Sequence, residues 1–172
     1  MFTRTHSLAR NTTPAAALAL SVLLLAGCGS SAPSKSEYTA KANAVCASTN
    51  AKTGPAIQQV TAAASALEKG GASGLPRLAD AIAQLHAAAA SGLAQLEKLE
   101  QPSGDHTQIS AFLVSYSTVV SGINEAATLL AKGQPQQAVA TLERLKPAAE
   151  QAAHGAQAYG LTQCATGFST LA

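Results

Sequence analysis

The sequence has no tryptophan, and its one methionine is the first residue. Because Met1 is the only methionine, no other methionine can bind a haem iron. The sequence also contains no Cys-x-x-Cys-His motif for covalent haem attachment. A Gly-x-Ser-x-Gly nucleophile elbow and a glycine-rich phosphate loop are also absent. We therefore expect no enzyme activity and no cofactor.

Charged residues are few and nearly balanced, with 11 Lys and Arg against 9 Asp and Glu. Two of the basic residues, Arg4 and Arg10, precede the first apolar segment, and the rest of the chain is close to neutral without a basic cluster. A protein that binds nucleic acid neutralises phosphates with a face of Lys and Arg. We expect no nucleic acid among the partners.

The start of the chain has the pattern of an export signal. Residues 1–14 carry Arg4 and Arg10 and no acidic residue, and residues 15–25 form a run that is apolar apart from one serine. A membrane-spanning helix needs about 20 apolar residues, so this run is too short to span. It fits the apolar region of a signal peptide.

Residues 25–28, Leu-Ala-Gly-Cys, resemble the lipobox of bacterial lipoproteins. The resemblance implies that residues 1–27 are removed, that Cys28 is acylated, and that the exported protein is anchored to the outer face of the cytoplasmic membrane. An ordinary signal peptide with a chance cysteine is the alternative. Residues 28–36 are expected to form a lipidated cysteine and a flexible tether of about 16 Å, which keeps the folded domain near the membrane.

Alanine and leucine dominate the remaining domain, residues 37–172, where apolar residues recur at helical spacing. Gly and Pro divide this domain into four helical segments. These are expected at residues 37–69, at residues 75–100, from a cap at Ser103 or Asp105 to Gly133, and from Pro135 to Gly160. Short connections make neighbouring helices antiparallel, so we expect an all-α, up-down-up-down antiparallel four-helix bundle. The regular seam of the second segment also suits a coiled coil that pairs with a partner.

Two prolines fall inside these segments. Pro55 follows Gly54 and removes a backbone donor, so the first helix is expected to be kinked near Gly54-Pro55 or to be divided there into two. Pro147 is expected to bend the fourth helix for the same reason.

Histidine and glutamate are placed too sparsely for a metal centre. Bundles hold di-iron sites with Glu-x-x-His motifs, and the nearest string here, Glu150 to His154, is one residue too long. His86 and His154 fall at about 16 and 28 Å from the same end of the expected bundle, too far apart to bind one metal ion. His106 and His154 lack a third ligand, so we expect no metal site.

The chain has three cysteines, Cys28, Cys46 and Cys164. If Cys28 is acylated, the other two remain in an oxidising compartment, and the bundle topology brings both to the same end. A disulfide there would close a loop of more than 100 residues, contribute about 4–5 kcal/mol in the chain-entropy model, and hold residues 165–172 against the first helix. Two buried free thiols are the alternative.

Short motifs around these cysteines carry a further resemblance. Asn43-Ala-Val-Cys46 near the start, Tyr159-Gly-Leu-Thr-Gln-Cys164 near the end, and a leucine-rich stretch broken by Pro102 resemble a group of small actinobacterial helical lipoproteins and secreted proteins. The resemblance covers most of the chain after the tether. It implies a disulfide-closed helical domain and no particular chemistry.

The aromatic residues after the tether all map to the half of the expected bundle that holds the cysteines. They are Tyr38, Phe112, Tyr116, Tyr159 and Phe168. One interpretation is a small apolar pocket or a partner-docking surface close to the membrane. The other is aromatic packing around a disulfide-closed end of the core.

Two functions of different classes are compatible with these patterns. The first is a non-catalytic, membrane-anchored bundle that binds a protein partner or another component of the cell envelope. The second is a carrier or sensor of a small apolar ligand, with a pocket between helices. An exposed apolar groove favours the first function, and an enclosed cavity of a few hundred Å³ favours the second.

Overall fold

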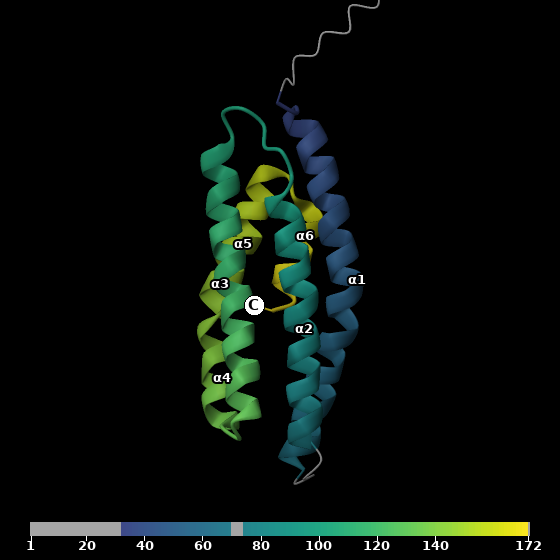
Figure 1. Cartoon of the computed structure of the whole chain (residues 1–172), viewed down its shortest axis with the longest axis vertical. Helices are drawn as coiled ribbons and strands as arrows, with labels where there is room; N and C mark the ends of the chain where they lie inside the picture. Colours follow the sequence, from purple (N-terminus) through teal and green to yellow (C-terminus); the bar gives the residue numbers. More distant parts are fainter. Residues whose placement is uncertain (1–31, 70–73, 172) are drawn as a thin grey trace, which may run out of the picture. The chain divides into compact units, whose positions relative to one another are not determined.

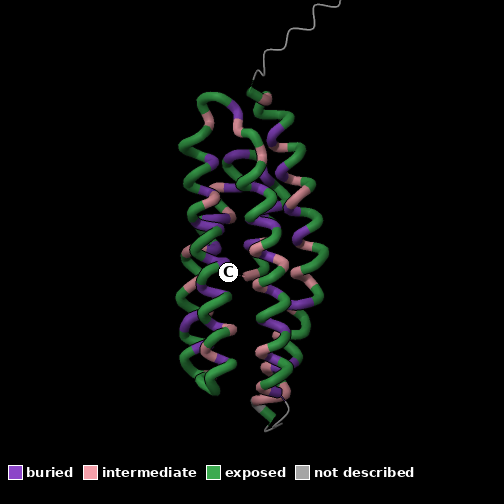
Figure 2. Tube along the Cα trace, viewed as in Figure 1, coloured by how far each residue is buried: buried purple, intermediate pink, exposed green. Residues whose placement is uncertain are grey.

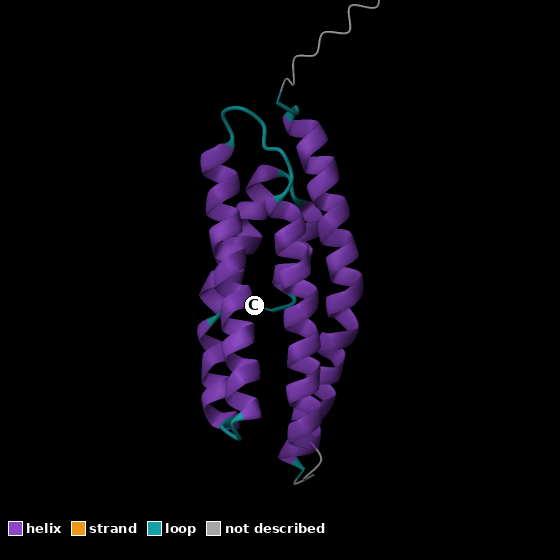
Figure 3. Cartoon of the chain, in the orientation of Figure 1, coloured by secondary structure: helices purple, strands orange, loops and turns teal. Residues whose placement is uncertain are grey.

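Six α-helices make up most of the residues that the computed structural model describes, 32–69 and 74–171, and none of these residues lies in a β-strand (Figure 3). The helices are α1 (Lys35–Glu68), α2 (Gly74–Glu97), α3 (His106–Ala131), α4 (Pro135–Arg144), α5 (Lys146–Tyr159) and α6 (Thr162–Ser169). The predicted all-α fold class is confirmed. The predicted signal peptide, Cys28 and the first residues of the predicted tether lie outside the described residues.

The first helix begins two residues earlier than predicted because of a capping box. The Ser34 hydroxyl accepts a hydrogen bond of 3.2 Å from the backbone N–H of Glu37, and the Glu37 carboxylate accepts one of 2.8 Å from the backbone N–H of Ser34. The hydrogen bond from the Ser34 backbone N–H is the main reason why the pKa of Glu37 is lowered, because it favours the ionised carboxylate. Lys35 and Ser36, which the sequence assigned to the tether, belong to the helix.

Helix α1 runs without a break through Gly54 and Pro55, so the alternative of two separate helices at this point is wrong. A proline inside a helix removes one amide donor and would break an isolated helix. Here α1 lies along α2 in the most extensive helix contact of the domain, and Ala56 directly after the proline is buried. Tertiary packing therefore maintains the helix across Pro55.

The predicted fourth helix is two helices, α4 and α5, which meet at Leu145. Pro147 lies in the first turn of α5, where its missing N–H costs no hydrogen bond. The predicted bend near Pro147 is thus a junction between two helices. The Leu145 side chain lies against Gly122 of α3 so closely that an added Cβ would collide with it, and the glycine is what permits this approach.

A short sixth helix replaces the tail that the sequence predicted. Gly160 ends α5 in the left-handed conformation, with φ of 94°, and turns the chain back over the bundle. Helix α6 follows and packs against both α1 and α5. Residues 165–169 of the predicted tail are thus held against the first helix, as expected, in helical form.

The long helices alternate in direction (Figure 1). Extensive contacts join α1 to α2, α2 to α3, and α3 to both α4 and α5, as the predicted up-down-up-down order requires. The fourth side of the bundle is different, because α6 lies between α1 and α5, and no comparable contact within the described residues joins α1 directly to α4. Helix α6 therefore covers one half of this side, and no helix within residues 32–69 and 74–171 covers the other half.

Buried residues follow the inward faces of the helices (Figure 2). In the half of the bundle that contains α6, the core contains the aromatic rings and the cysteine pair together with aliphatic residues such as Leu96, Ile109 and Leu161. Beyond the end of α6 the core is aliphatic. Its buried members on α2 and α3 include Ile82, Leu85, Val119 and Ile123.

Candidate functional site

The five aromatic residues predicted as a site pack against one another in two groups. Tyr38 and Tyr159 meet edge to face at 5.9 Å, and Phe168 contacts Phe112 at 6.1 Å and Tyr116 at 4.7 Å. Each of the five is at most 5% exposed. They form aromatic packing around the closed end of the core, which was the alternative to the predicted pocket. Phe112 and Tyr159 border an open hollow of about 440 Å³ between α3 and α5, and Tyr116 and Phe168 line a cavity of about 30 Å³.

Burial changes the acidity of the tyrosine hydroxyls. Tyr116 donates a hydrogen bond of 3.1 Å to the carbonyl oxygen of Ala89, and burial raises the pKa of Tyr116 to about 12. Tyr159 donates one of 2.6 Å to the carboxylate of Asp105, and burial together with this bond raises the pKa of Tyr159. Both phenols therefore stay protonated at neutral pH and act as structural donors.

A disulfide joins Cys46 of α1 to Cys164 of α6, with the two Cα atoms 4.9 Å apart. The predicted pairing is confirmed, and the alternative of two free thiols is wrong. Both cysteines are buried, at 4% and 2% exposure, so the bond is shielded from thiols in solution. Its place in the core indicates a structural bond.

Two asparagines on either side of Cys46 complete the attachment of α6. Asn43 donates to the carbonyl oxygen of Gly160 at 3.1 Å and accepts from the backbone N–H of Gln163 at 2.9 Å. Asn50 donates to the carbonyl oxygen of Gln163 at 2.7 Å. Sequence reasoning missed this role, although Asn43, Cys46 and Asn50 recur at intervals of three and four and so share one helix face.

That same face of α1 borders a larger cavity beyond the end of α6. The cavity has a volume of about 180 Å³ and is lined by residues of α1, α2, α3, α4 and α5. Its aliphatic lining consists of Ile57, Val60, Ile82, Leu85, Val119, Ile123, Leu142, Leu145, Ala149 and Leu171. Sequence reasoning placed the apolar pocket in the aromatic half, and this cavity lies in the aliphatic half.

The arrangement of the helices accounts for the cavity. Helix α6 occupies the space between α1 and α5, and it ends at Ser169. Beyond that residue no described helix fills the continuation of this space between α1 and α4. Ile57, Val60 and Leu142 are only partly buried although they line the cavity, so the cavity opens to solvent there.

The polar part of the lining consists of two threonines, Thr61 and Thr170. Both side chains are exposed, which places them at the mouth. Thr61 donates its hydroxyl proton to the carbonyl oxygen of Ile57 at 3.1 Å, and Thr170 donates to that of Gly167 at 2.7 Å. No charged residue lines the cavity, so it suits an apolar and uncharged group.

Other chemistry-bearing side chains are dispersed. Within residues 32–69 and 74–171, no three His, Cys, Asp or Glu side chains gather to hold a metal ion. The ring of His106 is hydrogen-bonded to the side chain of Gln101 at 2.8 Å, and His154 is exposed. None of the helices described above is both long and apolar enough to cross a membrane.

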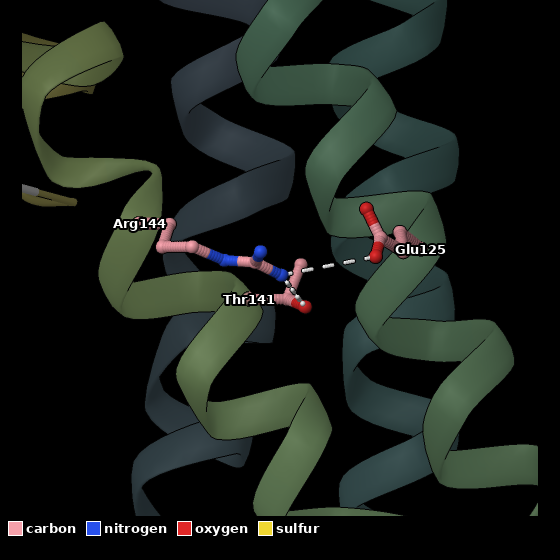
Figure 4. A network of polar contacts seen from close by, with 3 residues as sticks. All are labelled: Glu125, Thr141 and Arg144. Atoms are coloured by element: carbon pink, nitrogen blue, oxygen red, sulfur yellow. Dashed lines mark hydrogen bonds and ion pairs between the residues drawn. The ribbon is translucent and has the colours of Figure 1, made fainter.

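A surface ion pair joins α4 to α3 (Figure 4). The Arg144 guanidinium lies 3.9 Å from the Glu125 carboxylate and donates a hydrogen bond of 2.9 Å to the Thr141 hydroxyl. Both charged side chains are well exposed, so the pair contributes at most about 1 kcal/mol. Neither charge lines the cavity, and the pair stabilises helix packing without forming a site.

Comparison with protein-family models, with curated proteins and with solved structures finds no match for this chain. The function of this chain is therefore inferred from its own geometry. That geometry defines a disulfide-closed helical bundle with one side-opening aliphatic cavity of about 180 Å³.

Proposed function

We propose that this chain is an exported lipoprotein, anchored through acylated Cys28 to the outer face of the cytoplasmic membrane, whose helical domain binds a small apolar molecule. The observation that carries the ligand-binding proposal is the cavity of about 180 Å³ with its aliphatic lining and its opening between α1 and α4. The domain would act as a carrier or a sensor, without catalysing a reaction.

The cavity volume limits the size of the ligand. An apolar cavity of about 150 Å³ lined by Leu, Ile and Phe holds benzene or xenon, so this one has room for a single ring or a short alkyl chain. Burial of about 150 Å² of apolar ligand surface contributes about 4 kcal/mol. That corresponds to a dissociation constant of about 1 mM, and tighter binding requires ligand atoms that extend out through the mouth.

The other function considered, docking of a protein partner, receives less support. Val114 on α3 and Val139 on α4 are the large hydrophobic side chains that the described surface exposes, at 65% and 50%. In the antiparallel α3–α4 pair they are about 20 Å apart along the helix axes. Two separated valines do not make the contiguous apolar patch of a few hundred Å² that marks a docking site.

The anchor is supported by the Leu-Ala-Gly-Cys sequence at residues 25–28 and by its closeness to the folded domain. Helix α1 begins at Lys35, and seven residues span at most about 25 Å. Replacement of Cys28 by alanine should abolish labelling with an alkyne fatty acid in growing cells. Undiminished label on the Cys28→Ala chain would show that the anchor is assigned wrongly.

Ligand binding is best tested on residues 29–172 secreted behind a cleavable signal peptide. All the helix contacts described above lie within these residues, and no detergent is needed that would compete for the cavity. Toluene should produce saturable shifts in the methyl NMR signals of Ile57 and Leu142, because both side chains line the cavity. Val60→Phe should fill the cavity and abolish these shifts. Val114→Phe makes the same change on an exposed surface of α3 and should leave toluene binding intact.

Two results would overturn the ligand-binding proposal. One is the absence of saturable toluene shifts in a chain that circular dichroism shows to be folded. The other is equal toluene binding by folded Val60→Phe and Val114→Phe chains, because binding would then occur outside the cavity.

A further inference from the structure

We infer that the ligand of this cavity is uncharged and carries one hydrogen-bond donor, a hydroxyl or an N–H, which Thr61 and Thr170 bind at the mouth. The inference rests on the proposed function, because it specifies the ligand of the same cavity. The observation that supports it is that Thr61 and Thr170 are the two polar residues in an otherwise aliphatic lining.

The two threonines approach the cavity from different elements. Thr61 belongs to α1, and Thr170 caps the C-terminal end of α6. The disulfide and the two asparagines attach the first turn of α6 to α1, and the Asn50 side chain also lies against Gly167 near the end of α6. The mouth therefore presents two hydroxyl groups in a preorganised arrangement, which lowers the entropic cost of binding.

In the structure both hydroxyl groups can accept a hydrogen bond without breaking a bond that they already make. Each has already donated its proton within its own segment, Thr61 to Ile57 and Thr170 to Gly167. A hydroxyl that donates its one proton still has oxygen lone pairs that can accept. A ligand that brings the proton leaves both of these bonds in place, whereas a ligand that only accepts would have to displace one of them.

The lining also determines which charges are excluded. A carboxylate or a phosphate would face the lone pairs of the threonine oxygens, and the lining offers no cation to balance it. A charge of either sign drawn into the aliphatic part would lose its hydration without gaining a partner, which is strongly unfavourable. A neutral hydroxyl or N–H at the mouth exchanges a hydrogen bond to water for one to threonine.

The ligand is thus an apolar ring or short alkyl chain in the aliphatic part with its donor at the mouth. Phenol has this form, toluene has a similar shape without the donor, and benzoate has a similar shape with a negative charge. Since these molecules also differ in hydration, the informative quantity is the change that a protein substitution causes for each ligand.

The experiment measures phenol, toluene and benzoate binding by NMR titration of the folded chain of residues 29–172, secreted behind a cleavable signal peptide. Thr61→Val and Thr170→Val remove an acceptor and keep the shape of the side chain. Each should weaken phenol binding by about threefold to tenfold, as loss of one hydrogen bond implies, and should change toluene binding by less than about twofold. Benzoate should bind more weakly than toluene to the chain with both threonines.

Matched variants separate the hydroxyl effect from an effect on the helix. Thr118→Val removes a hydroxyl that donates to the carbonyl of Val114 at 3.0 Å, on α3 and outside the cavity, and should leave phenol binding unchanged. Thr61→Ser retains the acceptor and should retain phenol binding.

The outcomes distinguish the two proposals. If toluene binds and the Thr→Val variants weaken phenol and toluene equally, or if benzoate binds as well as phenol, the inference about the ligand is wrong and the ligand-binding function stands. If none of the three probes binds to the folded chain, the proposed function itself is wrong.

Discussion

The side-chain oxygen of Asn43 accepts a hydrogen bond of 2.9 Å from the backbone N–H of Gln163, 120 residues later in the chain. Gln163 lies in the first turn of α6, and the residue at the N-cap position, Leu161, has no side-chain oxygen to cap it. A helix N-terminus leaves backbone N–H groups without partners. Asn43 therefore supplies from α1 a cap that the local sequence of α6 lacks.

Asn43→Ala should lower the free energy of unfolding by about 1–2 kcal/mol, because it removes this cap and the hydrogen bond to Gly160. Urea unfolding followed by circular dichroism measures the change. Ser48→Ala, at an exposed position of the same helix, is the control for helix propensity and should change stability by less than about 0.5 kcal/mol. An equal effect of the two substitutions would contradict the capping role.

The Cys46→Ser/Cys164→Ser chain should lose about 2–5 kcal/mol of stability and lose structure first in α6. The disulfide closes a long loop, with a sequence separation of 118 residues, and reduction releases α6 from α1. Non-reducing mass spectrometry should find no free thiols at these positions in protein never exposed to reductant. Hydrogen exchange should be fastest in residues 162–169 of the double variant, and uniform exchange across the helices would argue against α6 as the weakest element.

Stability should fall as the pH rises above about 10. Burial raises the pKa of Tyr116 to about 12, whereas tyrosine in the unfolded chain ionises near about 10. Below pH 10 both states are protonated and the full stability is present, and between the two pKa values the unfolded chain releases its proton first. The urea midpoint should therefore decline from pH 9 to pH 12. Tyr116→Phe should show a smaller decline than the unsubstituted chain, and parallel declines would exclude Tyr116 as a cause.

Two glycines in helices should respond to alanine in opposite directions. A Cβ at Gly167 of α6 would collide with the Asn50 side chain, which is held by its bond to Gln163, so Gly167→Ala should destabilise the protein by about 1–3 kcal/mol. At Gly155 of α5 the nearest atom would lie 3.9 Å away, so Gly155→Ala should stabilise it by about 0.5–1 kcal/mol. Thermal unfolding should show opposite shifts in Tm, and a loss at both positions would indicate that helix packing near α6 is misjudged.

Local signals in the sequence were sufficient for the long helices. The periodic apolar residues and the punctuation at Gly133, Pro135 and Gly160 predicted their positions, and the order of the helices follows from the short connections. The junction at Leu145 was predicted only as a bend, because proline shows where a helix is weakened but not whether neighbouring helices make it end.

Helix α6 and the cavity could not be predicted in the same way. The eight residues of α6 are too few to form a stable helix alone, and its attachment depends on Asn43, Cys46 and Asn50, more than 100 residues away. The cavity depends on a space that no side chain fills, which periodicity cannot reveal. The shared half of the bundle in which the aromatic residues lie was compatible with a pocket and with packing, and in the structure the rings pack against one another.

The bond between Cys46 and Cys164 also sets an order of events when the protein is made. Synthesis proceeds from the N-terminus, so α1 emerges with Asn43 and Cys46 long before α6. Helices α2, α3, α4 and α5 are all made before the partners of these two residues in α6 exist. Until then the face of α1 that receives α6 is bare, with a thiol open to any other oxidising partner. Correct assembly of the mouth of the cavity therefore waits for nearly the last turn of the domain, and oxidation before that moment would trap Cys46 with the wrong thiol.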